Sequence, residues 1–141
     1  MLKEFFDAVE SGDLEKVRML LNEGADVNSD DRELRPHRYT KHGPELAKPF
    51  VTPLHQASER SNTEMVRLLL DHGADVDGHD GYGNTPLFYA VEDNDTEMVK
   101  LLLERGADAN AKNSAGWNLL SMANNHKNYK MTNLLMQHGG K

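Results

Sequence analysis

The chain of 141 residues contains no cysteine. Disulfides, thiolate metal sites and cysteine nucleophiles are therefore excluded. Long hydrophobic runs are missing too, because runs such as the three leucines at 68–70 fall far short of the roughly 20 residues that a membrane-spanning helix needs. The N-terminus carries Glu4 and Asp7 and has no apolar core region, which argues against a secretory signal. These absences favour a cytoplasmic protein that does not enter a membrane.

Positive charge is also scarce, since 16 Lys and Arg residues face 23 Asp and Glu residues. Nucleic-acid binding needs clustered Lys and Arg, so the net charge of −7 argues against nucleic acid as the main partner. One segment, from Arg32 to His42, departs from this balance with a local charge of +3, which leaves −10 for the remainder. The basic residues of that island are Arg32, Arg35, Arg38 and Lys41.

The chain repeats itself at an interval of 33 residues. A fixed period of this length is typical of a solenoid, in which each unit buries its apolar face against its neighbours. The matching segments are 52–55 with 85–88, 63–70 with 96–103, and 73–77 with 106–110.

Each unit is predicted to contain two helices. Threonine before Pro53 and Pro86 predicts helix starts, because a Thr hydroxyl can cap backbone amides and proline fits the first helical position. Apolar residues at helical spacing predict further helices over 63–70 and 96–103. Glycine takes the left-handed conformation that ends a helix, so the outer helices should stop near Gly24, Gly73, Gly106 and Gly139. Turn-forming residues over 77–84 predict a hairpin-like finger.

The spacing of these glycines counts the units. The steps are 49, 33 and 33 residues, so the first interval contains 16 surplus residues, which fall within 29–51. We therefore predict a single domain, 1–141, of four repeats at about 1–28, 29–77, 78–110 and 111–141.

The motifs Thr-Pro-Leu-His, Glu-Met-Val-(Arg/Lys)-Leu-Leu-Leu and Gly-Ala-Asp-Val resemble the ankyrin repeat over nearly the whole chain outside the insertion. The resemblance implies an all-α solenoid of helix-turn-helix repeats, with fingers and inner helices forming a concave face that binds other proteins. The first unit begins at a helix over 2–11 without a finger, and the last has 118–121 in place of the Thr-Pro-Leu-His motif, as capping repeats would. Phe88 stands where the family has the histidine that ties neighbouring loops.

The resemblance also identifies exposed, variable positions as partner contacts. Tyr82 and Trp117 stand out because aromatic residues are enriched among binding hot spots, although Trp117 could instead pack over the last repeat. The inner-helix positions are mostly acidic, which favours a basic partner segment; the alternative is an ordinary solvated face. Expected finger contacts are Gly81, Tyr82, Asn84, Ser114, Ala115 and Trp117, and expected inner-helix contacts are Glu10, Ser11, Glu59, Arg60, Glu92, Asp93, Asn125 and His126.

Three interpretations of the insertion stay open. It could cover the acidic face as a lid, contact an anionic partner, or be a tolerated surface excursion, because lengthening a loop costs little free energy. The lid interpretation gives the chain a regulatory or scaffolding role. Its candidate residues are Arg32, Arg35, Arg38, Tyr39 and Lys41, with Tyr39 and Phe50 as possible anchors.

Metal binding and catalysis are disfavoured. His72 and His79 lie near acids in the finger, and His37 and His42 lie in the insertion, but zinc needs three or four converging ligands. We expect the finger histidines on the surface and its acids bonded to nearby backbone. A metal or small ligand at the insertion histidines is a minor alternative. The adjacent acids Glu92 and Asp93 cannot flank one bond, and no nucleophile or nucleotide motif occurs. We expect a monomeric, non-enzymatic protein without cofactors that binds another protein.

Overall fold

The computed structural model describes residues 1–34 and 50–141. These residues form eight α-helices and no strand beyond an isolated bridge between Lys112 and Asn118, which confirms the all-α class. None of these helices is long and apolar enough to cross a membrane. The helices are α1 (Leu2–Ser11), α2 (Leu14–Asn22), α3 (Pro53–Glu59), α4 (Thr63–Asp71), α5 (Pro86–Glu92), α6 (Thr96–Glu104), α7 (Leu119–Asn125) and α8 (Tyr129–Gln137).

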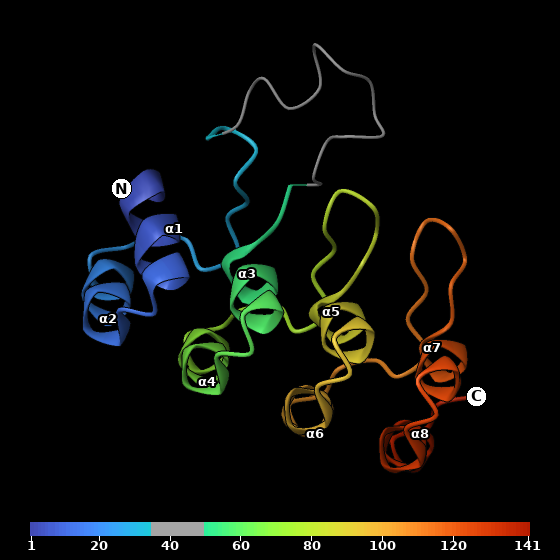
Figure 1. The fold of residues 1–141 in the computed structure, drawn as a ribbon. Coiled ribbons are helices and arrows are strands. Elements are labelled where there is room, and N and C mark those ends of the chain that lie inside the picture. Colours follow the sequence, from blue (N-terminus) through green and yellow to red (C-terminus); the bar gives the residue numbers. More distant parts are fainter. Residues whose placement is uncertain (35–49) are drawn as a thin grey trace.

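The helices are arranged in two layers of stacked pairs (Figure 1). The inner helices α1, α3, α5 and α7 contact one another in chain order, and each packs against the outer helix that follows it. The loops 78–84 and 111–117 project as fingers from the side of the inner helices (Figure 1). The described part of the chain is therefore a repeat solenoid; the predicted repeat boundaries stay a prediction.

The structure confirms the helix starts predicted from proline and the helix ends predicted from glycine. Pro53 and Pro86 are the first residues of α3 and α5. The four outer helices end shortly before glycines with positive φ, at 103° for Gly24, 90° for Gly73, 92° for Gly106 and 89° for Gly139. A side chain at such a φ would be strained, so glycine is needed there to turn the chain out of each helix.

The expected helix cap is present at Thr52 but absent at Thr85. The Thr52 hydroxyl accepts a hydrogen bond from the His55 amide at 3.4 Å and lies 2.7 Å from His55 Nδ1. At Thr85 no side-chain cap forms, since Phe88 replaces the imidazole that holds the equivalent hydroxyl. Thr85 is 1% exposed, and its hydroxyl has no partner among the described residues. A buried polar group in this state costs about 1–3 kcal/mol.

Apolar stripes on the outer helices form one continuous core along the solenoid. Met65, Val66 and Leu69 of α4 are fully buried, and so are their equivalents in α6. Burial of such a side chain contributes about 1.5–3 kcal/mol, so the stack is stabilised chiefly by these shared faces. Thr132 of α8 stands at the position of this valine and is only half-buried.

A ladder of hydrogen bonds connects the loops that follow the outer helices. Asn28 accepts from the Asp75 amide at 2.7 Å and donates to the Gly73 carbonyl at 3.2 Å. Asn110 makes the same two bonds two junctions further along. Asp77 accepts from the Asp108 amide at 2.9 Å, but a carboxylate has no N–H to donate. The middle junction therefore makes one bond fewer than its neighbours.

We expect Asp77→Asn to stabilise the fold by about 0.5–1.5 kcal/mol, because an asparagine there can also donate to the Gly106 carbonyl. The matched reciprocal variant, Asn110→Asp, should lose a comparable amount. Urea unfolding monitored by circular dichroism measures both. Equal midpoints for the two variants would show that the ladder contributes nothing.

The described ends of the insertion are held like the base of a short finger. The Asp31 amide donates to the Val51 carbonyl at 3.1 Å, and the Val51 amide donates to Asp31 Oδ1 at 2.9 Å. The Asp80–Asn84 pair closes the next finger with the same two bonds. The surplus residues therefore enter and leave the stack where a finger does.

Candidate functional site

The finger 78–84 is organised around the buried carboxylate of Asp80, which is 4% exposed. One carboxylate oxygen accepts from the amides of Tyr82 and Asn84, both at 2.8 Å. The other accepts from the Tyr89 hydroxyl at 2.6 Å, which links the finger to α5. The prediction that Asp80 takes part in the finger's own hydrogen bonding is confirmed. The bond from Tyr89 to Asp80 was not predicted. The repeat spacing does give a signal for the role of Asp80 itself, since Asp31, Asp80 and Asn113 occupy equivalent positions in successive repeats.

His55 ties this finger to the preceding repeat. Its buried imidazole donates from Nε2 to the Asn84 carbonyl at 2.7 Å, while Nδ1 accepts from the Thr52 hydroxyl. The ring also meets Tyr89 edge-on, with centroids 5.2 Å apart. Burial lowers the pKa of His55, so the tie is built from the neutral imidazole.

This tie predicts a loss of stability in mild acid. Because the folded pKa of His55 lies below its unfolded value near 6.5, the unfolded chain binds the proton first, and stability falls as the pH drops through 6.5. The slope for one proton is at most about 1.4 kcal/mol per pH unit. Lowering the pH from 7.5 to 5.5 should reduce the urea midpoint of the wild type more than that of His55→Phe. This variant introduces the residue that the next repeat has at the equivalent position, Phe88. If the midpoint shifts by the same amount in the wild type and in the variant, groups other than His55 cause the acid sensitivity.

The second finger, 111–117, is bonded to the first. Asn113 accepts from the amides of Ala115 and Trp117, both at 3.0 Å, and donates from Nδ2 to Asn84 Oδ1 at 2.9 Å. The Ser114 amide donates to the Tyr82 carbonyl at 3.0 Å. The predicted contact residue Asn84 thus holds the two fingers in register, and Ser114 and Ala115 lie exposed beyond that link.

The two predicted aromatic contacts are exposed on these adjoining fingers. Tyr82 is 46% exposed and Trp117 is 54% exposed. More than half of the Trp117 surface is thus open, which leaves this side chain available for a partner. Gly81 at the neighbouring finger position is exposed as well.

The C-terminal ends of α3 and α5 carry three exposed acids, Glu59, Glu92 and Asp93, which we call the acidic ridge. Partial burial raises the pKa of Asp93, and the nearby negative charges of Glu92 and Glu59 raise it further. Arg60 does not offset the ridge, because it pairs with Glu10 of α1 at 2.8 Å. The surface continues to the exposed Ser11 on α1 and to Asn125 and His126 beside α7, none of which is acidic.

His72, which follows α4, and His79 of the first finger each lie close to a nearby backbone carbonyl. His72 Nδ1 lies 2.9 Å from the Leu68 carbonyl, and His79 Nδ1 lies 3.0 Å from the Gly83 carbonyl. Within 1–34 and 50–141, no three or more His, Cys, Asp or Glu side chains are grouped so that they could hold a metal. His37 and His42 lie outside the described residues.

The predicted insertion site is described only at Arg32. Its guanidinium lies 4.1 Å from the centre of the Phe50 ring and 3.5 Å from Asp30. The role of Phe50 as an anchor of the insertion stays a prediction. Arg35, Arg38, Tyr39 and Lys41 lie outside the described residues, and so do the lid, anionic-partner and surface-excursion interpretations.

A family model described as ankyrin repeats in three copies matches residues 5–113 and again residues 79–141. The chain therefore belongs to the ankyrin repeat family, as its motifs predicted. A search of curated proteins finds no match. Ankyrin repeats generally mediate protein–protein interactions and are typically not enzymes, which agrees with the expected class of function.

Proposed function

We propose that this protein binds a partner protein through the surface formed by its fingers and inner helices. The observation that carries the proposal is the pair of exposed aromatic side chains, Tyr82 and Trp117, on two fingers that hydrogen bonds hold together. A rigidly held tryptophan contributes a large apolar surface at little cost in conformational entropy. Asn84, Ser114 and Ala115 complete the finger side of this surface.

The proposed partner carries a basic segment. Glu59, Glu92 and Asp93 stand together without a neutralising cation among the described residues, since Arg60 is paired with Glu10. A cationic segment is attracted to such a surface and offsets the mutual repulsion of its carboxylates. Asn125 and His126 extend the surface to α7. We propose that the protein acts as a monomeric adaptor in the cytoplasm, with no catalytic role.

Trp117→Ala should weaken partner capture by about 2 kcal/mol, the loss expected for a hot-spot tryptophan, and leave the melting temperature nearly unchanged. Affinity capture from cell lysate, quantified by mass spectrometry, measures the loss. The matched control is Tyr129→Ala, which removes an exposed aromatic side chain from the outer helix α8. Equal capture by the wild type and both variants would overturn the role of the finger face.

The acidic ridge should govern the rate of association. Glu92→Gln combined with Asp93→Asn is expected to slow association and to flatten its dependence on salt, because exposed charges act mainly through long-range attraction. The control is Glu104→Gln, an exposed acid on the outer helix α6. Surface plasmon resonance at two salt concentrations, with the captured partner, measures both effects. An unaltered salt dependence in the double variant would exclude a basic segment.

A further inference from the structure

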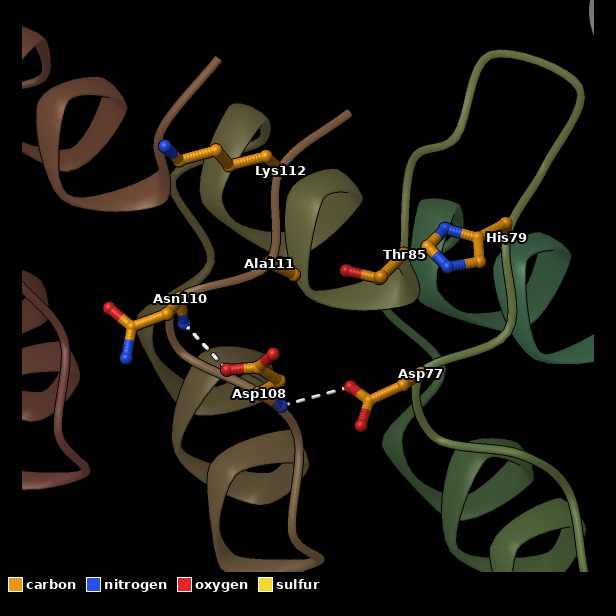
Figure 2. Close-up of a pocket in the computed structure, with 7 residues that line it drawn as sticks. All are labelled: Asp77, His79, Thr85, Asp108, Asn110, Ala111 and Lys112. Carbon is orange, nitrogen blue, oxygen red and sulfur yellow. Dashed lines mark hydrogen bonds between the residues drawn. The ribbon is translucent and has the colours of Figure 1, made fainter. Parts of the chain in front are cut away.

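A pocket of about 370 Å³ lies between the first finger and the chain leading into the second (Figure 2). Asp77, His79 and Thr85 line one side, and Asp108 with residues 110–112 lines the other. The pocket therefore opens between two successive repeats, separate from the exposed aromatic residues. Its volume suits a single side chain or a small ligand.

Thr85 lines this pocket, and its buried hydroxyl has no hydrogen-bond partner among the described residues. Thr85 is 1% exposed, and Figure 2 shows its hydroxyl pointing toward Ala111 on the opposite side. The equivalent Thr52 hydroxyl is held by His55, but Phe88 leaves the one at Thr85 without a partner in the described chain. A buried hydroxyl in this state favours a ligand that completes its hydrogen bonding.

The other polar groups of the pocket are chiefly acceptors. Asp77 and Asp108 each use one oxygen for a backbone amide, at 2.9 and 2.8 Å, and the second oxygen of each makes no bond within the described residues. His79 directs Nδ1 to the Gly83 carbonyl, which leaves Nε2 as an acceptor in the neutral ring. Lys112 extends its ammonium group away from the two carboxylates in Figure 2.

This arrangement of acceptors selects a cation with several N–H donors. Two carboxylates supply negative charge, and the hydroxyl and imidazole supply acceptors in other directions. A planar guanidinium group has five N–H donors and matches carboxylate oxygens better than a compact ammonium group does.

We propose that this pocket binds the guanidinium group of an arginine side chain supplied by the partner protein. The proposal rests on the proposed function, since it identifies one residue of the basic partner segment. It adds a second contact region between the repeats, beside the finger face.

The test uses N-acetylarginine amide as the probe and the complete chain as the protein. N-acetylcitrulline amide is the matched control, because its side chain has nearly the same shape without the charge. Two-dimensional NMR should show saturable shifts of the Gly83, Asp108 and Asn110 amides with the arginine compound and none with the citrulline compound. No partner is needed, so a failure here is distinguishable from a failure of the finger face.

Variants localise the effect. Thr85→Val removes the hydroxyl without removing a cap and should weaken the arginine compound about tenfold while raising the melting temperature. Asp108→Asn keeps an acceptor for the Asn110 amide but removes the charge, and should weaken binding by a similar factor. The control Thr52→Val, outside the pocket, should leave the affinity unchanged. Equal shifts with both compounds, or undiminished affinity in both pocket variants, would overturn the proposal.

Discussion

The structure depends on one constraint, that the apolar face of each repeat is buried by the next repeat. Met65, Val66 and Leu69 of α4 are completely covered, and the same pattern recurs in α6. Because this burial dominates the stability, it fixes the spacing of the helix pairs. The fingers emerge from the same stack, so their spacing and the bonds between Asn84 and Asn113 follow from it. The candidate binding surface is thus a consequence of core packing.

The polar ties between repeats vary from one junction to the next. The first junction has the Asn28 ladder and the Glu10–Arg60 ion pair. The second has the His55 tie but only half of the ladder, at Asp77. The third has the complete Asn110 ladder but no imidazole, because Phe88 takes its place. This last substitution keeps the core apolar and leaves the buried Thr85 hydroxyl without a partner among the described residues.

The sequence predicted the backbone well because local signals determine it. Proline at 53 and 86 begins the inner helices, and glycines with positive φ follow the outer ones, as expected. Tyr82 and Trp117 are exposed at their finger positions, although the sequence also allowed Trp117 to pack over the last repeat. The side-chain pairings were not predictable, since they join separate segments. Examples are the bond from Tyr89 to Asp80, the bond from Asn113 to Asn84 and the missing cap at Thr85. Each depends on distances that arise only after the repeats stack.

We propose that the finger face, rather than the outer helices, contacts the partner. Hydrogen–deuterium exchange on the free protein and on the complex captured from cells tests it most directly. We expect slower exchange on binding in residues 78–84 and 111–117 and in α5, with little change in α4 and α6. Protection confined to α4 and α6, with unchanged exchange in both fingers, would contradict it.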